Sequence, residues 1–185
     1  MLHRLNVEWP SLSIDFVAKS SPFEPLPPYQ TMQKYPFEVF TVQGSCNNSD
    51  KNSIYFSKWS QLHRTKFDDH PDPTDDDDPN ADEDPVVTVQ ELQTGCDVNR
   101  IRTLNNSPIV AIWNDLGDSG QLRMLDLSSN MEKLQSGVSS RKRESCKEVV
   151  LHTDAPGFAL SWNPHKIGEL VAGDQRGVVS VYTNN

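Results

Sequence analysis

Apolar and polar residues alternate with a period of two in short runs along most of the chain, and no long run has helical periodicity. Alternation of this kind predicts strands that bury one face. Turn-forming Gly, Asn, Asp and Pro residues separate the runs. Strands are therefore expected in three sets: 12–17, 38–42, 54–59 and 86–89; then 98–102, 109–113, 121–125 and 148–151; then 157–162, 169–172 and 178–182.

The spacing of these sets indicates an internal repeat. Corresponding strands of the second and third sets lie about sixty residues apart, and about twenty of those belong to a polar insertion at 128–147. Without the insertion the period is about 40 residues, the value expected of a four-stranded propeller blade. A β-sandwich also contains short strands, but it does not explain the period. The predicted fold class is all-β, a partial β-propeller with polar insertions at the tips of its strands.

The negative charge of the chain is concentrated in one segment. Between Asp68 and Asp84 there are ten carboxylates and no Lys or Arg, whereas the rest of the chain has sixteen acids and seventeen bases. The acidic loop at 66–85 also contains four prolines, which oppose a helix or an interior strand. Because like charges repel and little apolar area is available for burial, we expect this loop to lack a packed structure.

The acidic loop has two interpretations. Its carboxylates would attract a basic protein, or they would only keep a spacer solvated. A position near the propeller axis favours the first interpretation, and a position at the rim favours the second. The candidate partner-binding residues are Asp75, Asp76, Asp77, Asp78, Asp82, Glu83 and Asp84.

No pattern of residues predicts an enzyme, a cofactor or a metal site. The five histidines are scattered and have no zinc-ligand spacing to a cysteine, and the aspartate run lacks the central Gly of a calcium loop. No phosphate-binding loop, nucleophile elbow or dinucleotide fingerprint is present. The three cysteines share no paired spacing and are expected to be reduced thiols.

Charge and hydropathy also limit the partners. An acidic balance argues against direct nucleic-acid binding, which needs clustered Lys and Arg. No apolar run of 18 residues is present, so no membrane-spanning helix is expected. The short basic cluster at 141–143 is more typical of a solvated loop than of a nuclear-import signal.

The third strand set resembles a WD repeat. His152 matches the histidine of the Gly-His element, and Trp162 lies in the Leu-Ser-Trp-Asn-Pro string that follows. Gly173 and Gly177 match the tight turn between the second and third strands of a repeat. The set departs from the pattern at three positions of the Gly-His element and the buried hydrogen-bond tetrad, so we do not expect that tetrad to assemble. These positions are Leu151, Arg176 and Tyr182.

The N-terminal half narrows the resemblance. Two strings, Leu5-Asn-Val-Glu-Trp9-Pro-Ser-Leu-Ser13 and Gly95-Cys-Asp-Val-Asn-Arg-Ile-Arg102, resemble elements of the histone-binding WD-repeat family. Within that family they are most similar to the glutamate-rich WD-repeat proteins. Trp9 is expected to have a structural role there.

The resemblance implies a fold, a division of the chain and a function. Seven blades at about 40 residues each would need about 280 residues, so we expect about two and three-quarter blades and a fragment or truncated product. Residues 1–8 would be an N-terminal stub and 9–185 the partial propeller. The implied function is to chaperone or scaffold a basic client, a histone or a large-subunit ribosomal protein, in the nucleus and nucleolus. The alternative is a generic propeller scaffold whose acidic loop is only a spacer.

Overall fold

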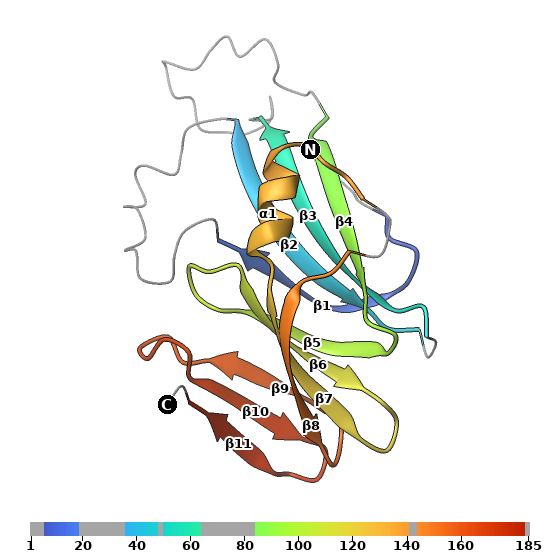
Figure 1. The fold of residues 1–185 in the computed structure, drawn as a ribbon, viewed down its shortest axis with the longest axis vertical. Coiled ribbons are helices and arrows are strands. Elements are labelled where there is room, and N and C mark those ends of the chain that lie inside the picture. The colour runs from blue at the N-terminus through green and yellow to red at the C-terminus, as the bar shows by residue number, and fades with distance from the viewer. Residues whose placement is uncertain (1–5, 19–35, 48–49, 64–83, 141–143, 184–185) are drawn as a thin grey trace, which may run out of the picture.

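The structure, a computed structural model, describes residues 6–18, 36–47, 50–63, 84–140 and 144–183. Its strands form three antiparallel sheets that follow one another along the chain (Figure 1). The first sheet consists of β1 (Ser11–Val17), β2 (Phe37–Ser45), β3 (Ser53–Leu62) and β4 (Val86–Gln93). The second consists of β5 (Asp97–Thr103), β6 (Ile109–Asp115), β7 (Gly120–Asp126) and β8 (Lys147–Thr153). The third consists of β9 (Gly157–Trp162), β10 (Leu170–Asp174) and β11 (Val179–Tyr182).

The strands predicted from the period-two pattern are confirmed, since each predicted run overlaps an observed strand of the same set. In β4, for example, Thr88, Gln90 and Leu92 are buried and the residues between them are more exposed. The all-β class and the count of two and three-quarter blades are also confirmed, because the sheets contain four, four and three strands.

The first strand of each sheet lies on the inner side of the arrangement. β1 packs against β5, and β5 packs against β9, whereas the last strands of the first two sheets, β4 and β8, lie outermost. Side chains of β1 hydrogen-bond to the free edge of β5: the Ile101 amide donates to Ser13 Oγ at 3.0 Å and the Thr103 amide to Asp15 Oδ2 at 3.0 Å. This is the arrangement of blades around a propeller axis.

Two apolar cores hold the sheets together. The first lies between the first and second sheets, where Phe40 and Phe56 meet with ring centroids 6.0 Å apart against Ile101 of β5. The second lies between the second and third sheets and is built around Trp113 and Trp162. Full burial of each large side chain contributes about 1.5–3 kcal/mol, so these cores dominate the stability of the fold.

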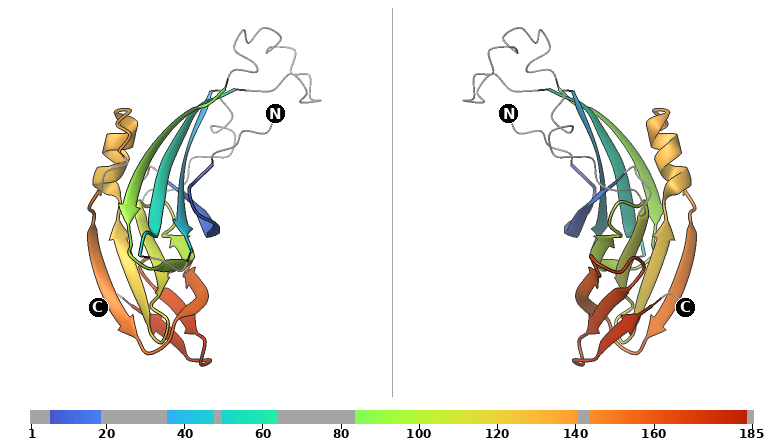
Figure 2. Two further views of the ribbon diagram at one scale, coloured as in Figure 1. Left: turned by 90° about the vertical axis from the view of Figure 1, so that its right-hand side faces the viewer. Right: turned by 90° about the vertical axis from the view of Figure 1, so that its left-hand side faces the viewer.

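A helix in the polar insertion was not expected from the sequence. The insertion at 128–147 contains α1 (Ser128–Gln135), which packs against β3 and β4 of the first sheet (Figures 1 and 2). Met131 and Leu134 are buried in the first core together with Leu127, which precedes the helix. The three residues are spaced i, i+4 and i+7, so they share one face of a helix. The prediction of a wholly irregular insertion was therefore wrong.

The insertion also extends the first sheet. Ser140 pairs in parallel with Gln90, and its amide donates to the Val89 carbonyl at 3.0 Å. The Glu91 amide in turn donates to the Ser140 carbonyl at 3.1 Å. An insertion that belongs to the second sheet thus covers part of the outer edge of the first, which removes an unpaired strand edge.

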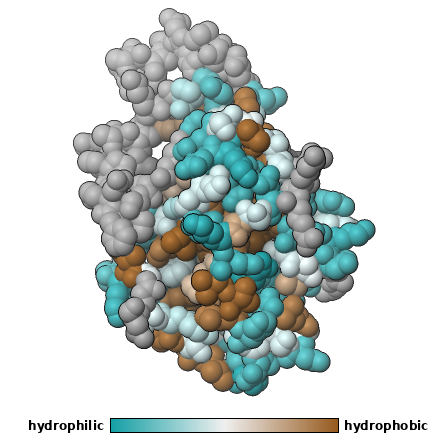
Figure 3. Space-filling view, viewed as in Figure 1, coloured by the Kyte–Doolittle hydropathy of each residue, from teal (hydrophilic) through white to brown (hydrophobic). Residues whose placement is uncertain are grey.

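The two end sheets expose apolar side chains on their outward faces. On β1, Leu12, Ile14 and Phe16 point outward and Phe16 is 68% exposed. On β11, Val179 and Val181 are 69% and 60% exposed. Figure 3 shows hydrophobic surface gathered over the lower half of the molecule, where the second and third sheets lie. These faces have the period-two pattern of a blade that packs against a neighbour.

Candidate interaction surfaces

The acidic loop is attached to the rim of the first sheet. Most of its candidate binding residues, Asp75 to Glu83, lie outside the residues that the structure describes; Asp84 is described and exposed. The loop joins the end of β3 at Leu62 to the start of β4 at Val86, and these are the two outermost strands of the sheet. Its attachment points are therefore far from the inner strand β1.

The WD-repeat residues identified from the sequence have separate roles. Trp9 is half-buried just before β1. Trp162 is buried in the second core, and its indole Nε1 donates to the Arg102 carbonyl at 3.0 Å, which ties the third sheet to β5. Gly177 has φ of +84°, a value that favours glycine, and lies in the turn between β10 and β11. Gly173 was expected in that turn but lies in β10, paired with Val179.

The buried tetrad of a WD repeat is not assembled in the described part of the chain. His152 is exposed on β8 opposite Gln121, and no side-chain hydrogen bond joins it to Tyr182 there. Arg176 instead forms ion pairs with Asp174 at 3.2 Å and Asp154 at 3.3 Å. The Val178 amide and Arg176 hydrogen-bond to Asp174 and hold the pKa of its carboxyl below the usual range. The turn is therefore fixed by an aspartate and an arginine at the surface.

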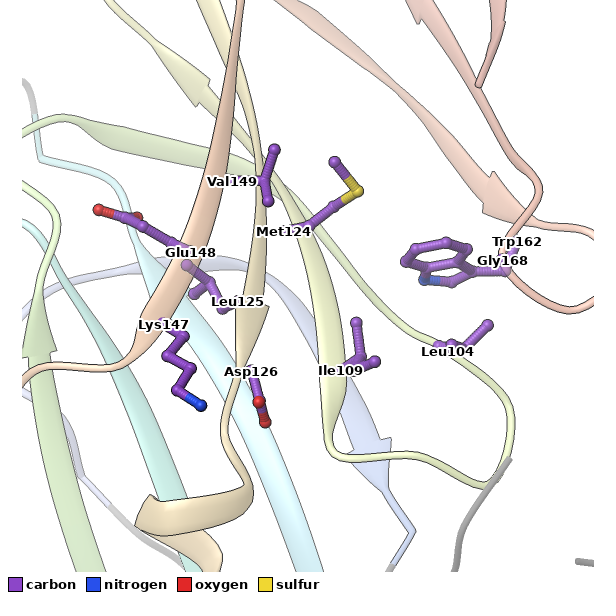
Figure 4. A pocket seen from close by; sticks show the side chains of 10 residues that line it. All are labelled: Leu104, Ile109, Met124, Leu125, Asp126, Lys147, Glu148, Val149, Trp162 and Gly168. Atoms are coloured by element: carbon purple, nitrogen blue, oxygen red, sulfur yellow. The ribbon is translucent and has the colours of Figure 1, made fainter. Parts of the chain in front are cut away.

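A cavity of about 280 Å³ lies between the second and third sheets (Figure 4). Its walls are apolar: Met124 of β7 faces the Trp162 indole of the third sheet across the opening. The charged side chains of its lining come from β7 and β8. The lining residues are Leu104, Ile109, Met124, Leu125, Asp126, Lys147, Glu148, Val149, Trp162 and Gly168.

The cavity combines apolar walls with carboxylates. The Ser128 hydroxyl and amide donate to Asp126 at 2.5 and 3.0 Å and keep the pKa of that carboxyl low, so it stays ionised. Glu148 is held by Arg123, whose Nε lies 2.8 Å from its carboxylate. This arrangement can accept an aliphatic side chain with a cationic end, because the stem packs on apolar walls while the charge meets carboxylates.

The described residues contain no cluster of His, Cys, Asp and Glu that could hold a metal ion. All three cysteines are free thiols. Burial, with the nearby Glu148 charge, raises the pKa of Cys146 to about 11, and burial also raises the pKa of Cys46 and Cys96. Neutral thiols are poor nucleophiles. No helix in the described part is long and apolar enough to cross a membrane.

Comparison with known proteins adds to this picture. Residues 1–63 match the family model described as histone-binding protein RBBP4 or the corresponding component of the CAF1 complex. The chain is 30% identical over 180 residues to ribosome assembly protein rrb1 of Schizosaccharomyces pombe, a match that covers 94% of this chain and 35% of that protein. It is 28% identical over 189 residues to glutamate-rich WD repeat-containing protein 1 of Dictyostelium discoideum, covering 94% of this chain and 37% of the relative.

The fold and these matches define the chain as a WD-repeat β-propeller protein. The resemblance drawn from its two N-terminal strings is confirmed: rrb1 and the glutamate-rich WD repeat-containing protein are homologues over nearly its whole length. A shorter match, 30% identity over 108 residues, covers 53% of this chain and 22% of the protein HEAT STRESS TOLERANT DWD 1 of Arabidopsis thaliana. The chain spans about a third of the length of the first two relatives.

Proposed function

We propose that this chain binds a basic protein, a histone or a ribosomal protein, and acts as a non-catalytic WD-repeat factor in ribosome assembly or histone handling. The observation that carries the proposal is the concentration of ten carboxylates between Asp68 and Asp84, against near neutrality elsewhere. A single-sign charge tract raises the local concentration of an oppositely charged protein and accelerates its association.

The relatives support the same class of client. One is described as a ribosome assembly protein, and the family model matched by residues 1–63 is described as histone-binding. Both histones and ribosomal proteins are strongly basic nucleic-acid-binding proteins. A nuclear and nucleolar location follows from this proposal, and Asp75 to Asp84 would attract the client.

The cavity beside Asp126 and Glu148 offers a second point of contact for the same client. Its apolar walls and ionised carboxylates suit a lysine or arginine side chain. The acidic loop would then act in the encounter, and the cavity would receive a side chain afterwards.

One observation favours the alternative, a scaffold whose acidic loop is only a solubilising spacer. The loop is attached between the outermost strands β3 and β4, and a rim position is the one expected of a spacer. The loop nevertheless has reach, since about 20 residues anchored at both ends can extend by about 30 Å. Attachment at the rim therefore leaves contact with a bound client open.

A pull-down separates the two functions. The 185-residue chain would be compared with a variant in which residues 68–84 are replaced by Gly and Ser, using core histones and a basic ribosomal protein as clients. The control converts four exposed carboxylates elsewhere to amides: Glu8, Asp50, Asp118 and Glu132. We expect the loop variant to lose the client and the control to retain most of it. Equal recovery by all three proteins would leave the loop as a spacer.

A further inference from the structure

Two arginines on the inner strand β5 face the third sheet. Ile101 packs into the core shared with the first sheet, so its neighbours in the alternation, Arg100 and Arg102, point the opposite way. Asn99, at the register irregularity between Val98 and Arg100, supports this direction because its side chain donates to the Gly157 carbonyl of β9 at 3.4 Å. Both guanidinium groups therefore lie where β5 and β9 meet on the inner side of the blades.

Among the described residues, neither guanidinium contacts a carboxylate. The other two arginines in that part of the chain do, since Arg123 pairs with Glu148 at 2.5 Å and Arg176 with Asp174 at 3.2 Å. Arg102 donates to the carbonyl of its neighbour Ile101, at 2.7 Å. The Nε of Arg100 is enclosed and has no acceptor within the described ranges. An enclosed donor on a charged group without an acceptor costs stability, so a ligand that accepts from it would bind favourably.

The equivalent junction between the first two sheets shows a contrast in chemistry. Each inner strand has a register irregularity, and the two positions that follow it are Ser13 and Asp15 in β1, and Arg100 and Arg102 in β5. Ser13 and Asp15 accept hydrogen bonds from the edge amides of the next inner strand. Arginine has no acceptor atom, so the second junction contains donors where the first contains acceptors.

We propose that Arg100 and Arg102 form a binding site for a carboxylate of an acidic peptide segment in a partner protein. A carboxylate presents two oxygens that match the fork of a guanidinium, and such charge-assisted pairs are among the strongest hydrogen bonds in proteins. β9 is the inner edge strand of its sheet, so its backbone amides add further donors beside the arginines. This site is independent of the basic-client function and lies on a different part of the molecule from the acidic loop.

An acidic peptide fits better than a nucleic acid. The chain has a net charge of −9, and Asp97 and Asp115 lie at the start of β5 and the end of β6 beside the site. A polyphosphate backbone would meet this repulsion along its whole length, and nucleic-acid binding needs many cationic contacts. A single carboxylate needs only the two guanidinium groups.

The test is fluorescence anisotropy with the full 185-residue chain and a fluorescein-labelled hexaglutamate peptide, with hexaglutamine as the uncharged probe. We expect hexaglutamate to bind at low salt and hexaglutamine not to bind. The double variant R100Q/R102Q should weaken the affinity for hexaglutamate by at least about tenfold. The matched control K51Q/K147Q removes the same charge from exposed positions and should change the affinity by less than about threefold.

Two further measurements keep the test decisive. The thermal midpoint of R100Q without peptide should equal or exceed that of the wild type, because the Nε of Arg100 lacks an acceptor among the described residues. A fall of several degrees would mean that Arg100 is structural and would overturn the proposal. A single-stranded RNA oligonucleotide serves as the second probe. No binding of hexaglutamate, equal losses in the two double variants, or binding of RNA in place of hexaglutamate would each overturn it.

Discussion

The side-chain amide of Asn130 on α1 donates to the side-chain oxygen of Gln90 on β4 at 3.0 Å, and both side chains are completely buried. The two residues belong to different sheets along the chain, since α1 follows the third strand of the second sheet and β4 closes the first. The Nε2 of Gln90 also donates to the Val138 carbonyl at 3.5 Å. A polar pair in the core therefore fixes the insertion to the first sheet.

We expect Asn130→Ala to lower the free energy of unfolding by about 1–3 kcal/mol, because it leaves the buried Gln90 oxygen without a donor. Ser129→Ala, an exposed change on the same helix, is the control and should stay within about 0.5 kcal/mol. Urea unfolding measures both. The double variant Q90M/N130L removes the two polar groups together and should cost less than the sum of its single changes. An Asn130→Ala protein as stable as the control would show that this contact does not hold the insertion.

Two glycines should differ in their tolerance of alanine for different physical reasons. A Cβ at Gly157 would lie 2.7 Å from the Trp113 ring and would collide with the Gly173 carbonyl. At Gly177 the space is open, but φ is +84°. We expect Gly157→Ala to cost about 3 kcal/mol or more through overpacking, and Gly177→Ala about 1–2 kcal/mol through backbone strain. Chemical unfolding of the two variants tests this, and the reverse order would mean that the second and third sheets do not pack as described.

The Cys146 thiol should react slowly with iodoacetamide in the folded protein. Its pKa is raised to about 11 by burial and by the charge of Glu148, so almost none of it is thiolate at about pH 8. A raised pKa means that folding favours the neutral thiol: this contribution to stability is complete below the unfolded pKa of about 9 and is lost as the pH rises through about 11.

This titration can be followed in a C46S/C96S variant, where Cys146 is the one remaining cysteine. We expect its alkylation to accelerate strongly between pH 9 and about 11, and to be faster in urea than in buffer at about pH 8. Equal folded and unfolded rates at that pH would contradict the burial of this thiol.

The sheets were predictable from the sequence because their cores are built by local alternation. Runs such as Ile109 to Trp113 and Gly157 to Trp162 carry their strand signal in a few consecutive residues, and the repeat adds the order of the blades. The helix α1 was missed because its Ser-, Lys- and Gln-rich composition hides a short apolar face. The spacing of Leu127, Met131 and Leu134 was the available signal.

The candidate sites were less accessible to sequence reasoning. Charge composition identified the acidic loop, but its attachment at the rim depends on which strands are outermost, a property of the whole sheet. The direction of Arg100 depends on the extra residue Asn99, which breaks the strict alternation of β5. The cavity beside Trp162 joins residues from two sheets, and no single segment of sequence encodes it.

Association kinetics test most directly whether the acidic loop attracts a basic client by charge. Stopped-flow binding to core histones or a basic ribosomal protein would compare the wild type with a variant in which Asp75, Asp76, Asp77 and Asp78 are changed to Asn. The control changes Glu8, Asp50, Asp118 and Glu132 to the corresponding amides, so that total charge is matched. Charge steering acts mainly on the association rate and is screened beyond about 8 Å at physiological ionic strength. We predict a slower association rate for the loop variant than for the control at low salt, and a difference that disappears as salt is added. Identical association rates for the loop variant and the wild type at low salt would contradict attraction by the loop.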